Sequence, residues 1–563
     1  MTAPLLSLEN VRVELGALKG MLAVVDDLSF QLEAGETLSI VGESGSGKSM
    51  AALAIMGLLP TIGRIAQGSI RFAGRDLTKL DDAALRSIRG NQIGMIFQEP
   101  MTSLNPVYKV GEQIAEVLRH HQGLSHSDAW ARAVELLDAV RIPDPKRRAG
   151  SYPHEMSGGQ RQRVMIAVAL ACRPKILIAD EPTTALDVTV QAEIFELMRE
   201  LAREIGTATI LITHDMGVVA EMADHVVVMF RGKKVEDGTV GDVIDRPSHP
   251  YTKSLIAAVP HLTTETATVS ISPTKEETST PILSVHDLRV EFNVKKRFGR
   301  REIFTAVNGI SFDVERGKTL ALVGESGSGK TTAALAVARL VTVQAGQVTL
   351  DGTDMLALHG EDLRRARAKV QVIFQDPYSS LNPRLRAGAI VREPLDGLGT
   401  LPEAERDDRV ADLFEQVGLG KDQMRLFPHQ FSGGQRQRIS IARALATNPA
   451  LIICDEAVSA LDVIIQAQIL DLLRDLQKSL GLTYLFISHD LGVVQQMCDK
   501  VAVMYMGNIV EYGDRYAVLS TPQMEYTRQL LAAVPSVDRA RERGFHKKEQ
   551  DDATGLGQLP VKT

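Results

Sequence analysis

One glycine-rich stretch occurs twice in the chain, as VGESGSGKS at residues 41–49 and as VGESGSGKT at residues 323–331. Each copy follows a short apolar segment and leads into an alanine-rich one, which is the strand–loop–helix context of a phosphate-binding loop. The glycines let the backbone turn its N–H groups toward the β- and γ-phosphates of a nucleotide, and the N-terminus of the following helix adds a favourable field. The spacing therefore predicts two nucleotide sites.

We expect each loop to bind ATP and, through its last hydroxyl, Mg²⁺. Lys48 and Lys330 would neutralise phosphate charge, and the hydroxyls of Ser49 and Thr331 would ligate the metal. The residues predicted to contact the nucleotide are Gly42, Glu43, Ser44, Gly45, Ser46, Gly47, Lys48, Ser49 and Met50 in the first copy, and Gly324, Glu325, Ser326, Gly327, Ser328, Gly329, Lys330, Thr331 and Thr332 in the second. An ordinary glycine turn before a helix is the alternative, and the repetition of the full pattern argues against it.

Two acidic pairs stand where buried strands are expected to end. The segments KILIAD and ALIICD close on Asp180 and Asp455, which we predict to contact Mg²⁺ directly or through water. Glu181 and Glu456 follow immediately and are placed to orient and polarise an attacking water. Such a pair could instead cap a helix, but its occurrence after a phosphate loop favours catalysis.

Histidines end the next pair of β-branched segments, ATILITHD and TYLFISHD. We predict that His214 and His489 reach the γ-phosphate. A single histidine at a strand end is more often structural, so the prediction depends on its repetition beside both acidic pairs.

A second anion-binding feature occurs in each copy, in the repeated letters SGGQRQR. We predict that each begins a helix, with serine as the N-cap and glycines that leave backbone N–H groups uncovered. The residues are Ser157, Gly158, Gly159 and Gln160, and Ser432, Gly433, Gly434 and Gln435. A phosphate loop already surrounds its own nucleotide, and a helical insertion carries this terminus away from it. We therefore predict that each copy presents this helix to the other copy's nucleotide; a capped core helix is the alternative.

The spacing of the motifs shows that a whole domain is repeated. Lys330 follows Lys48 by 282 positions and Ser432 follows Ser157 by 275, so the differences in length lie in the first half of the repeat. We predict a first domain over residues 1–262, a flexible linker rich in Thr, Ser and Glu over 263–280, a second domain over 281–535 and a polar tail over 536–563. A chain of 563 residues fits two domains better than one core.

Composition narrows the class of protein. A chain that is 44% hydrophobic and 24% charged has the balance of a soluble globular protein, and a net charge of −7 gives no sign of general affinity for nucleic acid. The three cysteines are far apart, which argues against a disulfide framework or zinc site and fits a reducing cytosol. We expect neither a secretory signal nor a membrane span, because no basic leader and no run of eighteen apolar residues occurs.

Apolar strands that alternate with helices must position these motifs. That alternation predicts a parallel sheet covered on both faces, and hence an α/β fold. Residues 108–155 differ, because apolar side chains recur there at helical spacing, with Ile114 and Leu118 on one face and Val134 and Leu137 on another. We predict a helical subdomain inserted between the first IFQ motif and SGGQ.

The order of the motifs resembles that of the ATP-binding cassette ATPases. These motifs are the glycine-rich loop, the glutamine of IFQ, SGGQ, the acidic strand end, ALD and the strand-end histidine. The resemblance covers nearly the whole chain, twice. The stretches FQEPMTSLNP, YPHEMSGGQ and RPSHPYTKSLIAAVP are similar to those in ATPase subunits of bacterial oligopeptide and dipeptide (peptide/nickel) importers, here with two subunits fused. This implies tandem P-loop NTPase domains, each with a mainly parallel core, an antiparallel β subdomain and a helical subdomain.

The resemblance also implies a head-to-tail pair of sites. One ATP would lie between the loop of Lys48 and the SGGQ of Ser432, and the other between the loop of Lys330 and Ser157. All catalytic positions are present in both copies, so we expect two competent sites.

Gln98 and Gln375 are implied as catalytic residues and Mg²⁺ contacts that relay cassette closure to partners. Those partners would be two transmembrane permease subunits, supplied by a periplasmic substrate-binding protein. The chain would lie at the cytoplasmic face of the bacterial inner membrane, attached through the permeases alone and without a nucleic-acid partner. There it would power the uptake of di- or oligopeptides or of glutathione-like peptides.

Three departures from the family pattern bear on the sites. An aromatic residue ahead of the loop usually stacks on adenine; the first copy has only Phe30, and the second offers Phe292, Phe298 and Phe304. Ala457 replaces the proline usual after the catalytic glutamate. The cysteine cluster that holds iron–sulfur in some relatives is missing, so we predict no such cluster.

Other functions remain as alternatives. Importer ATPases of this kind also serve nickel and other small solutes, and cargo is chosen by other subunits. A soluble twin-cassette translation factor would repeat the same motifs, but it would carry a long charged helical linker instead of about twenty polar residues.

Overall fold

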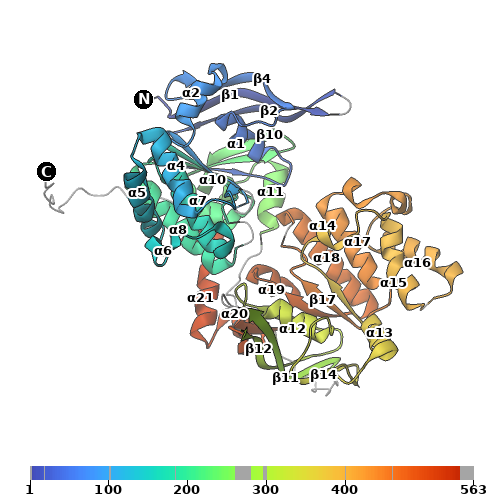
Figure 1. Ribbon diagram of the computed structural model, residues 1–563. Coiled ribbons are helices and arrows are strands. Elements are labelled where there is room, and N and C mark those ends of the chain that lie inside the picture. Colours follow the sequence, from blue (N-terminus) through green and yellow to red (C-terminus); the bar gives the residue numbers. More distant parts are fainter. Residues whose placement is uncertain are drawn as a thin grey trace.

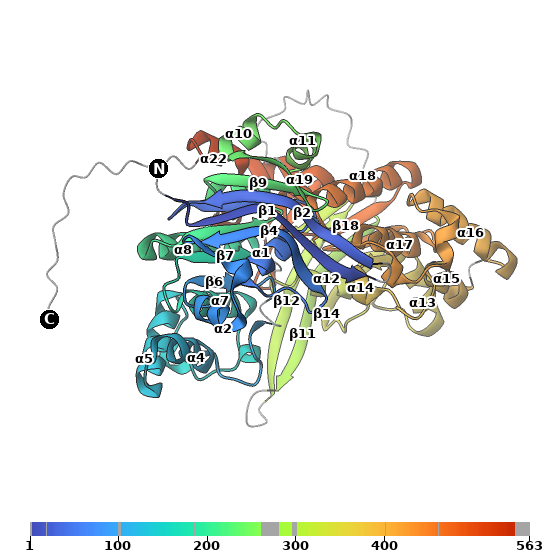
Figure 2. The same cartoon turned by 90° about the horizontal axis from the view of Figure 1, so that it is seen from above.

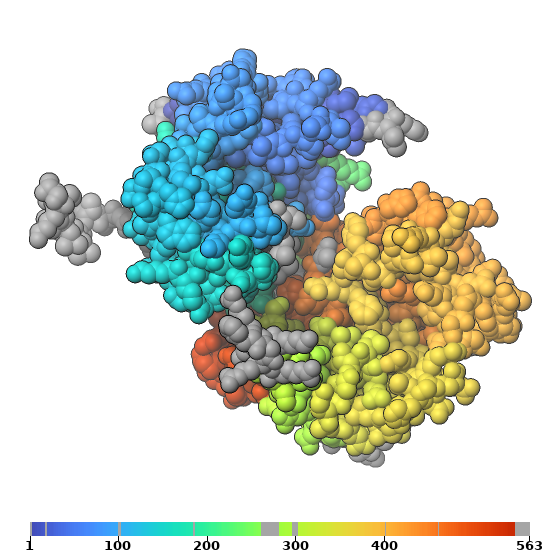
Figure 3. Space-filling view, viewed as in Figure 1, coloured from blue at the N-terminus to red at the C-terminus, as the bar shows by residue number. Residues whose placement is uncertain are grey.

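The computed structural model describes residues 3–17, 20–99, 103–183, 186–259, 281–295, 301–399, 401–459 and 461–545. Two lobes of the same architecture are seen, the first blue to green and the second yellow-green to red (Figure 1). The linker predicted over 263–280 lies outside the described residues. Figure 3 shows the lobes in space-filling form, with the red α21 of the second lobe lying against the first.

Each lobe is built on a six-stranded sheet and a four-stranded sheet. The six-stranded sheet of the first lobe has the order β10 (Lys233–Thr239), β9 (His225–Phe230), β3 (Thr37–Val41), β8 (Ala208–Thr213), β7 (Ile176–Asp180), β6 (Ile93–Ile96). That of the second has the order β16 (Val370–Ile373), β17 (Leu451–Asp455), β18 (Thr483–Ile487), β13 (Thr319–Val323), β19 (Lys500–Tyr505), β20 (Asn508–Asp514). In these two six-stranded sheets, the β9–β10 and β19–β20 pairs are antiparallel and the other described pairs are parallel.

The four-stranded sheets are antiparallel throughout. They have the orders β2 (Gly20–Leu32), β1 (Leu6–Ala17), β4 (Gly63–Phe72), β5 (Arg75–Asp76), and β12 (Arg301–Val314), β11 (Leu283–Lys295), β14 (Ala345–Leu350), β15 (Thr353–Asp354). The predicted α/β class, with a mainly parallel core and an antiparallel subdomain in each half, is therefore confirmed.

The helices repeat in the same order. Those of the first lobe are α1 (Lys48–Met56), α2 (Asp82–Ile88), α4 (Val110–Gln122), α5 (His126–Ala139), α6 (Pro145–Arg148), α7 (Gly158–Leu170), α8 (Val188–Ile205), α9 (Met216–Met222), α10 (Val240–Asp245) and α11 (Pro250–Ala257). Those of the second are α12 (Lys330–Val337), α13 (Gly360–Ala368), α14 (Pro377–Ser380), α15 (Ala387–Leu398), α16 (Glu403–Gln416), α17 (Gly433–Leu445), α18 (Val463–Leu480), α19 (Leu491–Met497), α20 (Arg515–Ser520), α21 (Glu525–Ala533) and α22 (Val537–Glu542). None of the helices within the described ranges is both long and apolar enough to cross a bilayer.

The strands that carry the motifs are short and buried on both faces. Residues of β3, β7 and β8 are almost all buried, because β-branched and aliphatic side chains fill both sides of a central parallel strand. Parallel strands place their carboxyl ends at one edge of a sheet, so the loops that follow β3, β7 and β8 meet there.

The predicted helical insertion is present as α4 and α5. Ile114, Leu118 and Leu137 are fully buried in one apolar cluster with α7, and Val134 packs against it. The insertion therefore packs directly on the SGGQ helix α7.

The predicted polar tail is wrong for its first ten residues. Residues 536–545 are described, and within them α22 crosses back to the first lobe and packs on α9, beside the green α10 (Figure 2). Val537 and Ala540 are buried in an apolar cluster of the first lobe, and Arg541 forms an ion pair with Asp245 at 2.8 Å. A polar composition hid this contact because only two apolar side chains of the helix are buried in it.

We expect Val537→Asp to release α22 from the first lobe. Burying a valine contributes about 2 kcal/mol, and a carboxylate in its place would have no partner in an apolar cluster. Hydrogen exchange measured by mass spectrometry should accelerate in α22 and α9 of the variant. Glu542→Gln, on the exposed side of the same helix, should leave exchange unchanged. Equal protection in Val537→Asp and the wild type would show that this contact does not hold the helix.

Candidate functional site

The first phosphate loop connects the buried strand β3 to α1. Gly42 has a φ of 151°, and a Cβ there would lie 2.2 Å from the carbonyl oxygen of Met229, so only glycine allows this approach of β9. Gly47, with a φ of 100°, is the N-cap of α1, and the helix begins at Lys48 within the loop. Gly324 repeats the same close approach in the second lobe. Both loops thus make the glycine-dependent turn that a phosphate-binding loop requires.

The lysine of each loop lies inside the curve of the backbone. Lys48 Nζ donates to the carbonyl oxygens of Gly42 and Glu43 at 2.8 and 2.9 Å, and Lys330 makes the same two bonds in its own loop at 2.8 and 2.7 Å. Burial lowers the pKa of both ammonium groups, against the opposing effect of nearby acids. Each lysine is therefore held where β- and γ-phosphate oxygens would lie.

The predicted magnesium ligands meet in both lobes. Ser49 Oγ donates to Asp180 Oδ1 at 3.1 Å, and Thr331 Oγ1 donates to Asp455 Oδ1 at 3.0 Å. Burial raises the pKa of Asp180 to about 6; the hydrogen bond from Ser49 opposes this rise, and the adjacent charge of Glu181 adds to it. Hydroxyl and carboxylate oxygens are the ligands that Mg²⁺ prefers, so this donor set fits the ion.

The predicted catalytic side chains of the first lobe form one cluster around Glu181. Gln98 Nε2 donates to Glu181 Oε2 at 2.8 Å, and His214 Nδ1 lies 3.4 Å from Oε1. Burial raises the pKa of Glu181, but the hydrogen bond and charge of His214 outweigh it and hold the pKa at about 2. Glu181 has a φ of 44°, a left-handed conformation that costs energy in a residue other than glycine and is found mainly at functional sites.

The second lobe repeats this cluster around Glu456. Gln375 Nε2 donates to Glu456 Oε2 at 2.7 Å, and His489 Nδ1 lies 3.3 Å from the same oxygen. Glu456 also has a positive φ, 47°, although Ala457 follows it instead of proline. The turn therefore keeps its conformation without proline. Both histidines contact the glutamate in this structure, whereas the sequence predicted that they would touch phosphate.

The SGGQ segments begin helices α7 and α17 as predicted. Ser157 Oγ accepts from the N–H of Gln160 at 3.3 Å, and the glutamine side chain accepts from the serine N–H at 3.3 Å. Ser432 and Gln435 form the same capping box. The glutamine amides were predicted to contact the nucleotide; here their oxygens complete the caps.

Glycine is required inside the SGGQ caps for packing as well as for exposure. A Cβ on Gly159 would lie 2.7 Å from Val190 of α8, and one on Gly434 would lie 2.5 Å from Ile465 of α18. The glycines therefore let each SGGQ helix sit directly on the helix that follows the ALD letters of its own lobe. A movement of α8 or α18 would therefore displace the SGGQ terminus that packs on it.

Each phosphate loop contacts the opposite lobe. Asp462 Oδ1 accepts from the N–H of Ser44 at 2.5 Å, and Asp187 Oδ1 accepts from the N–H of Ser326 at 2.5 Å. Both aspartates are N-caps, of α18 and α8, yet neither side chain caps its own helix. Their carboxylates bind the other lobe's loop instead. The loop of Lys48 therefore faces the second lobe, and the loop of Lys330 faces the first.

One hydrogen bond between the lobes is made at the second phosphate loop and is not repeated at the first. Thr189 Oγ1 donates to Glu325 Oε1 at 2.7 Å, whereas the equivalent position of the second lobe is Ile464, which has no hydroxyl to donate to Glu43. Burial raises the pKa of Glu43, and the charge of Asp462 adds to this rise. The two sites are thus built on one plan but differ in the contact opposite the loop glutamate.

The aromatic residues considered as stacking partners for adenine differ in their burial. Phe30 is buried in the core of the first lobe and cannot stack on a ligand, which removes the only candidate of that copy. Phe292 and Phe304 are cross-strand partners on β11 and β12 and remain 41% and 54% exposed, so both can reach a base. Phe298 lies outside the described residues. The corresponding pair on β1 and β2 is Leu15 and Leu22, which are aliphatic.

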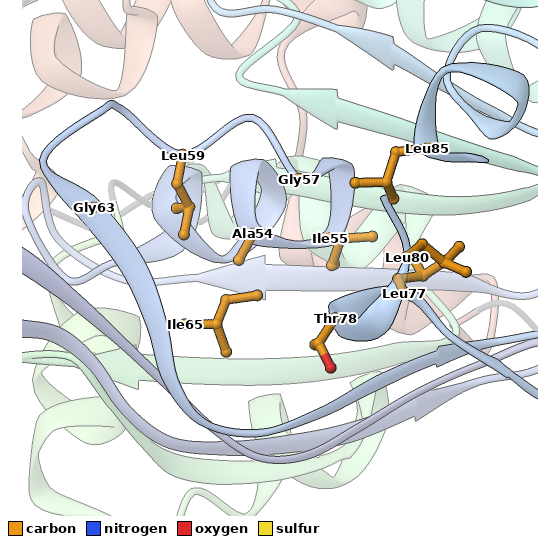
Figure 4. Close-up of a pocket in the computed structure, with 10 residues that line it drawn as sticks. All are labelled: Ala54, Ile55, Gly57, Leu59, Gly63, Ile65, Leu77, Thr78, Leu80 and Leu85. Carbon is orange, nitrogen blue, oxygen red and sulfur yellow. The ribbon is translucent and has the colours of Figure 1, made fainter. Parts of the chain in front are cut away.

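A pocket of about 340 Å³ lies apart from these clusters, between α1, β4 and the short 3-10 helix η1 (Leu77–Lys79) (Figure 4). Its lining is apolar or glycine except for Thr78. It offers no titratable group, and we assign it no chemistry.

Sequence reasoning missed Asp187, Asp462 and Thr189 as contacts between lobes. The letters ALD recur after both acidic pairs and were used only as a family mark. Two further residues, Tyr251 and Tyr526, bind the phosphate loops from the repeated letters YT near the end of each domain. Repetition was a signal that could have flagged all but Thr189, whose counterpart is isoleucine.

Comparison with known proteins gives a consistent result. The profile of the ABC transporter family matches residues 25–184 and 307–459, and that of the oligopeptide/dipeptide transporter C-terminal region matches 235–282 and 510–558. The chain is 50% identical to the glutathione import ATP-binding protein GsiA of Escherichia coli O157:H7 and 49% identical to that of Escherichia coli strain K12. Each alignment spans 97% of this chain and 92% of the relative. A solved dimeric structure of the ATP-binding cassette MJ0796 bound to ADP and Pi is 27% identical, covers 41% of this chain and 98% of that one, and has a TM-score of 0.38.

Proposed function

The chain belongs to the ABC transporter family as a twin-cassette ATP-binding protein, and on that premise we propose that it powers the import of glutathione or similar small peptides across the bacterial inner membrane. The observation that carries the proposal is the pair of complete phosphate loops, each in contact with the ALD aspartate of the opposite lobe. Identity of about half over nearly the full length of the glutathione importer ATPases supports the choice of cargo.

The residues of each loop bind and neutralise ATP. Lys48 and Lys330 supply the positive charge, and the backbone N–H groups supply the donors. Ser49 with Asp180, and Thr331 with Asp455, would hold Mg²⁺, which when bound neutralises charge on the phosphate oxygens.

The glutamates orient the attacking water and accept its proton. Glu181 is ionised and is fixed by Gln98 and His214, so it can accept that proton without first reorienting. The left-handed backbone of Glu181 keeps its carboxylate at the end of β7, next to the metal-binding Asp180. Glu456 would act in the same way in the second lobe.

Closure on ATP completes each site from the opposite lobe. Asp462 already reaches the loop of Lys48. It stands at the N-cap position of α18, and α18 carries the SGGQ helix α17 of Ser432 on its surface. A closed state stabilised by ATP and released after hydrolysis gives two states with different ligand affinity, which is what alternating access requires.

Exposed apolar side chains suit the attachment to permeases. Phe97 precedes the first catalytic glutamine, with Val107 and Tyr108 further along the same segment, and Phe374 and Tyr378 flank the second glutamine; all are at least 38% exposed. Such a patch fits short helices of two permease subunits and would place the chain at the cytoplasmic face of the membrane. A substrate-binding protein would select the cargo outside the cell.

Uptake assays test this proposal. In a strain of the source bacterium that lacks this chain, uptake of labelled glutathione should be lost and should return with the wild-type chain. It should not return with a chain that carries both Lys48→Ala and Lys330→Ala, although permease subunits should still co-purify with it. Undiminished uptake of glutathione and of labelled dipeptides, with loss of nickel uptake instead, would overturn the cargo. Sedimentation with ribosomes in place of permeases would overturn the importer itself.

A further inference from the structure

The letters YT of the C-terminal motif have no role in the reaction described above, yet they reach both phosphate loops. Tyr251 Oη accepts a hydrogen bond from the N–H of Glu43 at 2.8 Å. Tyr526 Oη accepts from the N–H of Glu325 at 3.1 Å. The same contact is thus made twice, by helices α11 and α21, whose sequences share only YT, a later leucine and the following AAVP.

Each tyrosine is held firmly enough to position a loop. The ring of Tyr251 stacks on Phe230 with centroids 4.3 Å apart, and that of Tyr526 packs on Tyr505 at 4.4 Å. Phe230 and Tyr505 end β9 and β19, whose preceding carbonyl groups lie against the first glycine of each loop. The tyrosine, the strand end and the loop therefore form one packed unit.

The helices that carry the tyrosines are tied to the same sheet. Glu236 of β10 accepts from the N–H groups of Ser248 and His249 at 2.7 and 3.1 Å, which fixes the start of α11. Glu511 of β20 does the same for α21, with Gln523 and Met524 as donors. A carboxylate at a helix N-terminus is stabilising, so each motif helix has a fixed base.

The same helices touch the opposite lobe. Ile256 and Val259, at the end of α11, pack in one apolar cluster with Ile464 of α18. In the other half, α21 packs on α8 (Figure 1). The N-cap aspartates of α18 and α8 bind the loops. Each loop is therefore bound by one helix of its own lobe and by one helix of the opposite lobe, and these two helices pack against each other.

The first limb of each loop, residues 42–44 and 324–326, is therefore held from two sides. In the first limb the N–H of Glu43 is taken by Tyr251 of the same lobe, and the next N–H, of Ser44, is taken by Asp462 of the opposite lobe. Burial raises the pKa of Tyr251 to about 12, so the phenol stays protonated and the contact does not depend on pH in the physiological range.

We propose that Tyr251 and Tyr526 are positioning residues for ATP binding, which hold the first limb of each phosphate loop and tie it to the contact between the lobes. The proposal rests on the proposed ATPase function. It gives the C-terminal motif of each domain a role at the nucleotide site of its own lobe.

The test measures ATP binding by the full-length chain, one site at a time. Lys330→Ala isolates the loop of Lys48, and binding of mant-ATP with Mg²⁺ reports on it. Adding Tyr251→Phe should weaken binding about three- to tenfold, the loss expected for one neutral hydrogen bond. Adding Tyr526→Phe should leave that site unchanged. In the Lys48→Ala background the two results should exchange.

A kinetic split and a matched control separate positioning from general stability. In the otherwise wild-type chain, each tyrosine variant should raise the KM for ATP more than it lowers kcat, and hydrogen exchange should accelerate in its own loop limb. Tyr512→Phe removes a hydroxyl that donates to the carbonyl oxygen of Asp313 at 3.2 Å, away from the loops, and should change none of these.

Unchanged ATP affinity and loop exchange in both tyrosine variants would overturn the inference, as would effects equal to those of Tyr512→Phe. If the wild-type chain itself neither bound mant-ATP nor responded to Lys48→Ala, the proposed function would fail instead. The two failures are therefore distinct.

Discussion

The chain with Glu181→Gln and Glu456→Gln is expected to lose ATP turnover by about 10²–10⁴-fold, the contribution of a general base, while it keeps its ATP bound. Both glutamates are ionised, lie against a histidine and occupy a left-handed backbone turn beside the aspartate proposed to bind Mg²⁺. Glutamine has the same shape but cannot accept a proton. The variant should therefore accumulate the closed, ATP-loaded form.

Phosphate release and retention of radiolabelled ATP on the purified chain measure the two halves of this prediction. Glu204→Gln, at an exposed position of α8, is the control and should turn over ATP at the wild-type rate. Rapid hydrolysis by the double variant would contradict the role of water activation. Loss of ATP binding together with hydrolysis would instead mean that the glutamates support the loop.

The second prediction concerns which lobe completes which site. In a Lys330→Ala background, where the loop of Lys48 remains, Ser432→Arg should weaken ATP binding on the order of tenfold or more, as expected for lost hydrogen bonds to a charged group. Ser157→Arg in the same background should add little. The reason is geometric: Asp462, at the start of the helix beneath Ser432, already reaches the N–H of Ser44 across the lobes.

Binding of mant-ATP, rather than hydrolysis, measures this effect, because turnover can require both sites. The reciprocal pair in a Lys48→Ala background is the internal control, and there Ser157→Arg should be the damaging change. If each serine instead affected the loop of its own lobe, the head-to-tail assignment would be wrong.

The difference between the lobes concerns residues that do not repeat. Thr189 donates to Glu325, whereas the equivalent residue of the second lobe, Ile464, has no hydroxyl to donate. Phe292 and Phe304 stand where the first lobe has leucines. The two lobes must be superimposed to interpret these differences, because the role of each side chain depends on the residue that it contacts.

Much of each site could be predicted because its residues are close in sequence or end neighbouring parallel strands. The loop around Lys48 is continuous, and Asp180, Glu181 and His214 follow β7 and β8, whose carboxyl ends must share one edge. The helical insertion could be predicted from apolar spacing at Ile114 and Leu118. The capping role of Gln160 was missed, although a serine followed three residues later by glutamine is the sequence signature of a capping box.

The amino-acid sequence by itself determined the repeat, the α/β class, the two phosphate loops and the acidic strand ends, since local periodicity and glycine spacing encode these directly. Only the tertiary structure decided that Asp462 and Asp187 cross between lobes, that Tyr251 and Tyr526 hold the loops, and that α22 packs on the first lobe. Each of these contacts joins residues more than a hundred positions apart, through one or two hydrogen bonds or buried side chains. Such contacts leave no period in the chain, because they depend on how finished domains pack against one another.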